Sequence, residues 1–343
     1  MNPLRLLVLL VSLPLLLGGC EKKESVAEVK AVEEKQQEVK PEEPVSETKP
    51  TEAVSVSPNL KYETEGDAVT ITACDKNASG ALTIPATIEG HPVTSIGASA
   101  FKNCTSLSSI TIPDGVTNIG GGAFINCSIL TGITIPDSVA SIGEIPFSGC
   151  ESLTSITIPD GVTRIGGFAI FNCKSLTNIT IPDSVTSFGV EAFNGCNSLT
   201  SITIPDNVTS ILEGAFAHCS SLTSITIPDG VISIETDTFR DCTSLESVTI
   251  GNGVTTIGRQ AFHGCTSLTS MTIPDSLSQY RIIGDFAFCS CSSLTAVIFL
   301  GDAPRDGAQV FLEATPTIYR KPEAKGWGDT FGGRPVKLIS EKP

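Results

Sequence analysis

The sequence is poor in large aromatic side chains and in histidine: its 343 residues include one Trp, three Tyr and three His. None of the histidines, His91, His218 and His263, belongs to a metal-ligand motif. A phosphate-binding glycine loop, a nucleophile elbow and a recognisable pairing of a nucleophile with a base are missing as well. The sequence therefore argues against an enzyme, with no catalytic residue, metal or cofactor to assign.

Positive charge is also scarce, because 22 Lys and Arg residues stand against 37 Asp and Glu residues and leave a formal net charge of −15. Such a surface repels phosphate backbones and anionic lipid headgroups, which excludes nucleic acid as an expected partner. What is abundant is Ile, Thr, Ser and Gly, a composition that favours short strands and turns over helices.

An apolar run at residues 6–17 is shorter than the roughly 20 residues that a membrane-spanning helix needs, and it follows Arg5 as the core of an export signal does. The next residues, Leu17-Gly18-Gly19-Cys20, resemble the lipobox of bacterial lipoproteins. That resemblance implies a signal peptide at residues 1–19 and a lipid on Cys20 that anchors the chain to a membrane. The alternative is an ordinary secretory signal that happens to end in Cys.

Residues 20–58 are rich in Glu, Lys, Val, Pro and Ser and contain no aromatic residue. They cannot bury enough apolar surface to offset the entropy of ordering, so we expect a disordered tether with a reach of roughly 35 Å.

The main feature of the chain is a repeat with a period of 23 residues, marked by cysteine. Each unit reads Cys-x-x-Leu-x-x-Ile-Thr-Ile-Pro-Asp-x-Val-x-x-Ile-Gly-x-x-Ala-Phe-x-x. Within a unit, Ile110-Thr111-Ile112 alternates as a half-buried strand does, and Pro113 ends the strand in a turn. The marker residues, the last of which follows after 26 residues, are Cys104, Cys127, Cys150, Cys173, Cys196, Cys219, Cys242, Cys265 and Cys291.

This pattern resembles the BspA-type branch of leucine-rich repeats, found in bacterial surface proteins, over residues 82–299. The resemblance implies a solenoid. A single unit buries too few apolar side chains to fold alone, so the units must stack and share their faces. We therefore expect a mainly β solenoid of stacked 23-residue units with parallel strands, short turns instead of helices on the outer side, and β caps at both ends.

The predicted organisation is an N-terminal cap with a partial repeat at residues 59–103, repeats at 104–299 and a C-terminal cap at 300–343. The N-terminal cap should contain a hairpin that turns at Gly66, and the C-terminal cap should cover the open edge of the last strand. Within the array, Pro146 replaces the usual Ala, and Ile170 replaces the usual Phe with Phe171 beside it.

Two repeated columns of side chains admit a chemical interpretation. The cysteines could form a metal ladder or a disulfide chain, but parallel stacking points their Cβ atoms the same way, so we expect buried free thiols. Any disulfide is expected where Cys74, Cys289 and Cys291 leave the regular spacing. The aspartates after each Pro could bind Ca²⁺, but we expect each to accept hydrogen bonds from its own turn.

Ligand binding would use one of three surfaces. The outward strand positions are nearly uniform Ser and Thr, which suits a flat repetitive ligand such as ice, or no ligand. Side chains vary instead in the two residues before each Cys and the two after Ile-Gly, a pattern typical of binding loops on a fixed scaffold. There the candidate ligand-binding residues are His218, Arg240, Asp241, Arg259 and His263. A rival site is the C-terminal aromatic region around Tyr319 and Trp327.

The resemblance to BspA-like proteins implies a cell-surface or extracytoplasmic adhesion and protein-interaction scaffold, anchored to the bacterial envelope at the outer membrane or the cell surface. The expected partner is an extracellular or envelope protein or a glycan. The alternative is a structural envelope lipoprotein without a dedicated ligand.

Overall fold

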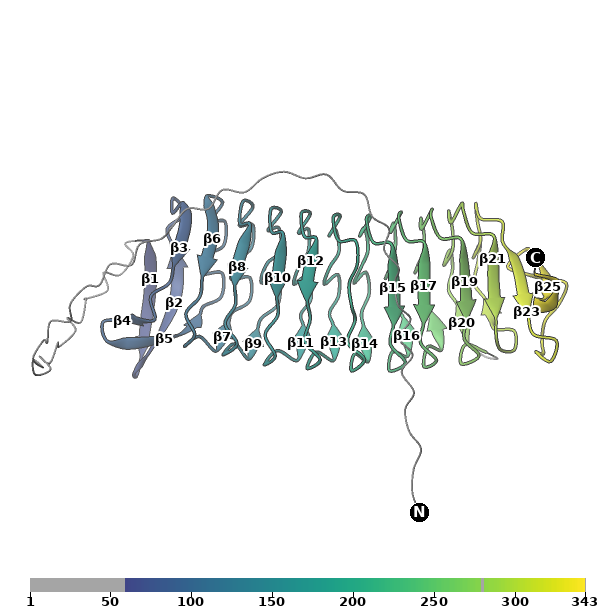
Figure 1. The fold of residues 1–343 in the computed structure, drawn as a ribbon, viewed down its shortest axis with the longest axis horizontal. Coiled ribbons are helices and arrows are strands. Elements are labelled where there is room, and N and C mark those ends of the chain that lie inside the picture. Colours follow the sequence, from purple (N-terminus) through teal and green to yellow (C-terminus); the bar gives the residue numbers. More distant parts are fainter. Residues whose placement is uncertain (1–58, 279–280, 343) are drawn as a thin grey trace, which may run out of the picture. The chain divides into compact units, whose positions relative to one another are not determined.

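A computed structural model of the chain describes residues 59–278 and 281–342. The expected signal peptide, Cys20 and the tether lie outside the described residues. The described residues form a β-solenoid in which successive coils of 23 residues lie side by side in chain order (Figure 1). Within them the one helical element is the 3-10 turn η1 (Ile339–Glu341), and no helix there is long and apolar enough to cross a membrane. The mainly β solenoid with turns in place of helices is therefore confirmed.

Each coil contributes to two parallel series of strands. The main series carries the alternating Ile-Thr-Ile segment, and in the coil between Cys196 and Cys219 that segment is not a regular strand. The main series comprises β3 (Gly80–Thr83), β6 (Leu107–Thr111), β8 (Gly132–Thr134), β10 (Ser155–Thr157), β12 (Asn178–Thr180), β15 (Ser224–Ile227), β17 (Ser247–Ile250), β19 (Ser270–Ile273), β21 (Ala296–Phe299), β23 (Thr317–Arg320) and β25 (Arg334–Leu338).

The second series of strands follows the Pro-Asp turn of each coil and is mostly two residues long, ending at an inward-facing Ile or Phe in most coils. It comprises β5 (His91–Ile96), β7 (Asn118–Ile119), β9 (Ser141–Ile142), β11 (Arg164–Ile165), β13 (Ser187–Phe188), β14 (Ser210–Ile211), β16 (Ser233–Ile234), β18 (Thr256–Ile257), β20 (Ile282–Ile283) and β22 (Arg305–Asp306).

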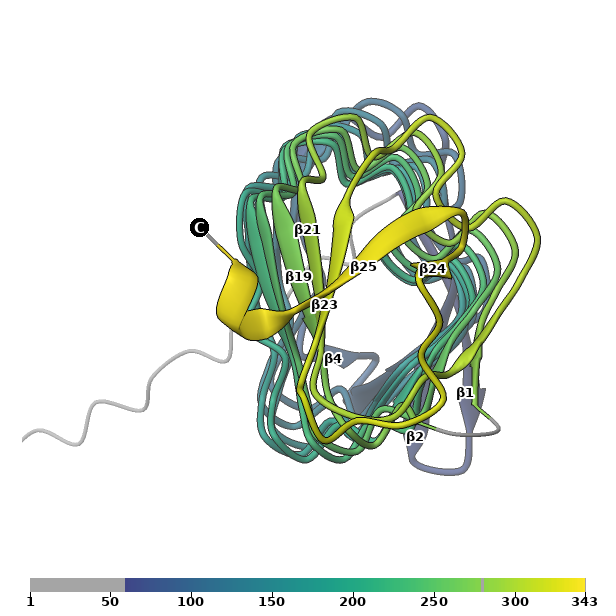
Figure 2. The same ribbon diagram turned by 90° about the vertical axis from the view of Figure 1, so that its right-hand side faces the viewer.

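The register between coils equals the sequence period. In the pair β15–β17, Ser224 lies beside Ser247 and Ile227 beside Ile250, an offset of 23 residues. The end view shows the coils superimposed around a common interior (Figure 2). Because equivalent residues stack, each inward position forms a column of like side chains along the solenoid.

The interior is filled by these columns. In the coil that begins at Cys104, the inward Leu107, Val116, Ile119 and Phe124 are all fully buried. The Phe column stacks nearly face to face, with the Phe216 ring 5.3 Å from one neighbour and 5.5 Å from the other, at interplanar angles of 5° and 2°. Its members are Phe101, Phe124, Phe147, Phe193, Phe216, Phe239, Phe262, Phe288 and Phe311.

The column cysteines are buried free thiols, as expected. The sequence did not predict their hydrogen bonds: Cys127 Sγ donates to the carbonyl oxygen of Phe101 in the preceding coil at 3.2 Å, and the same bond recurs at 3.1–3.3 Å through Cys291. Burial raises the pKa of the Cys173 thiol to about 12, so this thiol stays protonated and able to donate. Each Cys therefore fills space and ties neighbouring coils together.

Two departures from the repeat have compensations nearby. Pro146 lacks an N–H, but its carbonyl oxygen still accepts the bond from Phe124 N–H at 2.9 Å that joins the coils. Ile170 interrupts the Phe column, and the buried Phe188 of β13 packs edge-on against Phe193 with ring centroids 5.3 Å apart. A smaller residue in one column is thus accompanied by a larger one in the next.

The N-terminal end contains the expected hairpin: β1 (Leu60–Glu65) and β2 (Ala68–Cys74) pair antiparallel around Gly66, whose φ is +60°. β2 also pairs parallel with β5, so the hairpin covers the first edge of the stack. A second small hairpin joins β4 (Thr87–Ile88) to β5 through Gly90. The charged side chains of β1 keep this edge polar, which discourages pairing with another chain.

At the C-terminal end the coil continues past the residue-299 boundary drawn from the sequence. β22 and β23 extend the two strand series in parallel, Phe311 stacks on Phe288 at 5.5 Å, and Ala314 stands in the place of the column Cys. The Cys marker is lost there while the backbone register persists. β25 then pairs parallel with β23 and antiparallel with β24 (Thr330–Phe331), closing the end.

The stacked Phe column should carry much of the stability. We expect Phe216→Ala to lower the free energy of unfolding by about 3–5 kcal/mol, because a fully buried ring between two others leaves a cavity. Urea unfolding followed by circular dichroism measures this, with Ser224→Ala on the exposed face of β15 as a control expected to change stability by less than about 0.5 kcal/mol. Equal losses in both variants would contradict the role given to the column.

Candidate functional site

The side chains that differ most from coil to coil lie on the turns that join each short strand to the next column Cys. We call this series of turns the turn ridge; in the coil ending at Cys127 it spans residues 120–126. Within it, Gly122, Phe124 and Asn126 donate their N–H groups to carbonyl oxygens of the next coil at 2.8–2.9 Å. The inward Ala and Phe hold the ridge to the core, and the residues between them face outward.

The backbone of the ridge has a left-handed conformation at two positions in every coil. The first lies five residues before the position of the column Cys, and the second lies one residue before it. Examples are Ser99 with φ +57° and Asn103 with φ +61°. Gly, Asn, Asp and Ser suit such positions, whereas bulky or β-branched side chains there are strained. Each left-handed position lies within one of the two variable pairs found in the sequence.

One segment of the turn ridge is charged and contains four of the five candidate residues. The Asp241 carboxylate lies 3.5 Å from His218 Nδ1, 3.4 Å from Arg240 Nε and 3.7 Å from His263 Nδ1. Arg240 also lies 3.8 Å from Asp237, three residues earlier in the same turn. We call these five residues the Asp241 cluster. It spans three successive coils and remains partly exposed, with 48% of the His218 side chain accessible.

The Asp241 cluster is incompletely hydrogen-bonded. Asp237 Oδ1, Arg240 Nε and His263 Nδ1 are buried atoms without a hydrogen-bond partner among the described residues, although all lie within ion-pair distance of an opposite charge. Buried polar atoms are usually satisfied, so at these three atoms the ion pairs take the place of well-aligned hydrogen bonds. No group of three or more His, Cys, Asp or Glu side chains in the described part of the chain is arranged to hold a metal ion.

Arg259 does not join the Asp241 cluster. Its side chain is exposed and makes no ion pair within residues 59–278 and 281–342, while its backbone carbonyl accepts the N–H of Asp237 at 3.0 Å. It therefore stands on the ridge beside the cluster as an accessible cation. Sequence spacing placed it on the correct edge, but the direction of its side chain could not be read from spacing.

Trp327, the rival candidate, belongs to the C-terminal cap. Its indole packs against Phe299 at 4.9 Å and Phe331 at 5.4 Å, and its Nε1 donates to the carbonyl oxygen of Gly301 at 3.3 Å. Only part of the ring is accessible. These contacts give Trp327 a structural part in closing the end of the solenoid.

A second, apolar segment of the turn ridge was missed by sequence reasoning. Ile145 is 37% exposed with φ +60°, and Phe168 in the next coil is partly exposed with φ +52°. Phe171 packs edge-on against Phe168 with ring centroids 5.6 Å apart. Ile145 N–H donates to the carbonyl oxygen of Gly167, so the two coils are held side by side. We call Ile145, Phe168 and Phe171 the apolar ridge segment.

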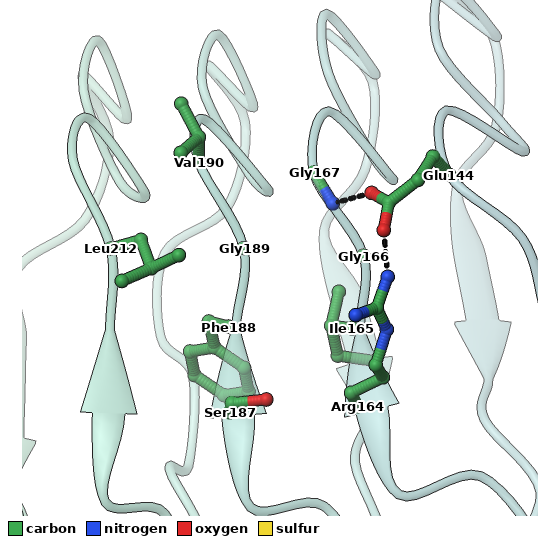
Figure 3. Close-up of a pocket in the computed structure, with 10 residues that line it drawn as sticks. All are labelled: Glu144, Arg164, Ile165, Gly166, Gly167, Ser187, Phe188, Gly189, Val190 and Leu212. Atoms are coloured by element: carbon green, nitrogen blue, oxygen red, sulfur yellow. Dashed lines mark hydrogen bonds and ion pairs between the residues drawn. The ribbon is translucent and has the colours of Figure 1, made fainter.

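The apolar ridge segment adjoins a shallow groove of about 240 Å³ (Figure 3). The Glu144 carboxylate lies at one end, where it accepts hydrogen bonds from Arg164 and from Gly167 N–H, and Val190 and Leu212 lie at the other. Glycines form the floor, and a Cβ on Gly166 would come within 2.8 Å of the Glu144 carboxylate.

The Ser and Thr face of the main strands offers less for recognition. Its outward positions are uniform, as in the exposed Ser224 and Thr226 of β15. A neighbouring column of threonines uses its hydroxyl groups internally: Thr154 Oγ1 donates to the carbonyl oxygen of Thr131, and Thr177 Oγ1 to that of Thr154, both at 3.2 Å. Those hydroxyls support the stack rather than a ligand.

Comparison with known proteins agrees with this architecture. The family described as BspA type leucine rich repeat region, in six copies, matches residues 81–199 and 187–313. No curated protein matches the sequence.

Solved structures of bacterial leucine-rich repeat proteins are similar to the chain. The leucine-rich repeat protein of T. pallidum is 29% identical, with 61% of this chain and 88% of that chain covered and a TM-score of 0.45. A leucine-rich cell surface protein of Faecalibacterium prausnitzii is 27% identical over 74% and 93% of the two chains, with a TM-score of 0.43. The pneumococcal vaccine antigen PcpA is 21% identical over 83% and 93%, with a TM-score of 0.46. Since the family match spans more than half of the sequence, the chain belongs to the BspA-type leucine-rich repeat family.

Proposed function

We propose that this chain is a cell-surface scaffold, held to the bacterial envelope by a lipid on Cys20, that binds an extracellular or envelope partner through the turn ridge. The observation that carries the proposal is the distribution of variation. Core columns repeat the same side chains from coil to coil, while the ridge changes from apolar to charged over a few coils. A rigid frame with variable turns is the arrangement that binding proteins use.

The apolar ridge segment favours a binding role for two reasons: its side chains are exposed, and its backbone is strained. Most other coils place small or polar residues such as Ser99, Gly122 or Gln260 at the position that Ile145 and Phe168 occupy, and Phe286 is one further bulky apolar residue there. A left-handed conformation costs a side chain with a Cβ roughly 1–2 kcal/mol, and partial exposure offers little burial in return. Strain of this kind concentrates at functional sites. An exposed aromatic and aliphatic group is also the type of contact that dominates protein interfaces.

The spacing of the two ridge segments favours a protein partner over a glycan. Ile145 and His263 stand five coils apart, which at the 4.8 Å spacing of parallel strands is about 24 Å along the stack. One partner that contacts both must be a folded surface or a long extended segment. The apolar contacts would supply affinity, and the Asp241 cluster with Arg259 would supply charge selectivity.

The export and anchoring part of the proposal is supported by the residues 6–20 pattern and by the family resemblance. Protease added to intact cells tests it: we expect the repeat region to be degraded while a cytoplasmic marker protein survives. Protection of the repeats on intact cells, with degradation after the envelope is opened, would favour the alternative of a structural lipoprotein inside the envelope.

Replacing Arg240, Arg259 and His263 together by Ser should leave the circular dichroism spectrum and the unfolding midpoint nearly unchanged. Affinity for a partner captured by the full-length chain should fall at least about tenfold, equivalent to 1.4 kcal/mol. Trp327→Ala is the comparison variant and is expected to destabilise the cap. Loss of affinity in Trp327→Ala alone, with the fold intact, would move the binding site to the C-terminal cap.

The double variant Ile145→Gly and Phe168→Gly should separate stability from binding. Glycine relieves the left-handed strain, so we expect the free energy of unfolding to stay the same or rise by about 1 kcal/mol while partner affinity falls. Gly149→Ala is a matched control at a left-handed ridge position with φ +73°, and it should lose about 1 kcal/mol of stability. A large loss of stability in the double variant would show that the two side chains serve folding instead.

Lipid attachment has a direct test at Cys20. The Cys20→Ser variant should remain unprocessed and should not incorporate a labelled fatty acid in cells, because the thiol that carries the diacyl group is gone. Wild-type protein labelled in parallel provides the reference, and equal labelling of both would exclude Cys20 as the anchor.

A further inference from the structure

The N-terminal end of the cysteine column differs from the rest of it. Every column thiol from Cys127 onward donates to a carbonyl oxygen of the preceding coil at 3.1–3.3 Å. Cys104 has no full coil before it, and its Sγ lies 3.9 Å from the carbonyl oxygen of Asp75. Cys74 Sγ lies 3.5 Å from the same oxygen. Two thiols thus share one distant acceptor.

Cys74 occupies the position in its turn that corresponds to the Phe column, and not the position that corresponds to the Cys column. Along the ridge, Phe101 N–H donates to Ala123 of the next coil, and Cys74 N–H donates in the same way to Ala100, each at 2.7 Å. The turn from Ile71 to Cys74 is two residues shorter than the turn from Ile96 to Phe101. Cys74 therefore approaches Cys104 from a neighbouring column, with a side chain that enters the core at a different place.

The two thiols are neighbours, because both lie within 3.9 Å of the Asp75 carbonyl oxygen. Their interaction raises the pKa of Cys74 and lowers that of Cys104, and the nearby Lys76 cation lowers the pKa of Cys104 further. A lowered thiol pKa raises the fraction of thiolate, which is the species that attacks a disulfide. Cys74 is also 9% exposed, whereas the thiols of the Cys column are wholly buried.

Contact alone does not distinguish this pair, because Cys127 and Cys150 also interact. That pair lies in adjacent parallel coils, where Cβ atoms stay near the strand spacing of about 4.8 Å and a disulfide prefers roughly 3.5–4.5 Å. Each of its thiols is also held by a carbonyl oxygen at 3.2 Å and is sealed from solvent. At Cys74 and Cys104 the distances to the shared carbonyl oxygen are longer, 3.5 and 3.9 Å, and Cys74 is 9% exposed although Cys104 is fully buried.

We propose that Cys74 and Cys104 form a disulfide that fastens the N-terminal hairpin to the first coil. The oxidant is a low-molecular-weight disulfide, RSSR. One thiolate of the pair attacks it, forming a mixed disulfide and releasing RS⁻, and the second thiolate then attacks the protein sulfur of that mixed disulfide and releases another RS⁻. Both leaving groups take up the protons lost by the cysteines, so two protein thiols and RSSR give one protein disulfide and two RSH.

The bond closes a loop between residues 74 and 104 at the end of the stack that has no preceding coil to support it. A cross-link that restricts the unfolded chain raises stability most where the native geometry accepts it without strain. The hairpin and the first coil should then unfold together and at a higher temperature than in the reduced protein.

The test uses the native full-length chain with oxidised glutathione, followed by alkylation in denaturant, digestion and mass spectrometry. We expect a linked peptide pair containing Cys74 and Cys104, alkylation of the thiols from Cys127 to Cys265, and a rise in the midpoint of the first unfolding transition. A native chain that yields no such linked pair, or one that links Cys127 to Cys150 instead, overturns the proposal.

Two variants keep the result interpretable. Cys74→Ser should abolish the linked pair and the rise in midpoint, whereas Cys289→Ser, an irregular thiol at the other end of the column, should leave both unchanged. If Cys74→Ser fails to fold, Cys104→Ala replaces it, since Ala314 shows that alanine fits the column position. A rise in midpoint that persists in the folded Cys74 or Cys104 variant would contradict the assignment.

Discussion

Everything in this molecule depends on the hydrogen-bonded register between one coil and the next. The 23-residue offset that pairs Ile227 with Ile250 also sets Phe216 on Phe239 and brings Cys242 Sγ to the carbonyl oxygen of Phe216. No single coil has enough apolar surface to fold by itself, so these contacts form together or not at all. The three residues inserted between Cys265 and Cys291 leave the columns aligned, because the extra length is taken up between β19 and β20.

Much of the fold was predictable because the repeat turns one local pattern into a whole architecture. Alternation in Ile110-Thr111-Ile112 predicted the strand, and the fixed period predicted parallel pairing. The coil past residue 299 was not predicted, since Ala314 removes the marker on which the alignment was built while the backbone ladder continues. The hydrogen bonds from thiols to carbonyl oxygens were also not predictable from the sequence, because they depend on how the backbone of each turn is placed rather than on residue type.

The candidate site was predictable only in part, and the reason lies in the backbone. Spacing brought His218, Asp241 and His263 together correctly, since residues 23 or so apart must stack. It could not show that the positions of Ile145 and Phe168 are left-handed, and so spacing did not single out these two residues. A signal was present: Ser99, Gly122, Gly214 and Asp237 hold that position in other coils, and such residues are the usual occupants of left-handed turns.

The ladder also gives the molecule a mechanical character. Its bonds between coils run along the stack, so a force that pulls residues 59 and 342 apart acts on each interface from its edge and can peel one coil at a time. A released coil of 23 residues extends by roughly 70 Å beyond its folded rise, given about 3.4 Å per extended residue. Because the interfaces between coils are nearly equal, each coil should be released at a similar force. The chain would then lengthen in steps, while the coils that remain folded keep their side chains in register.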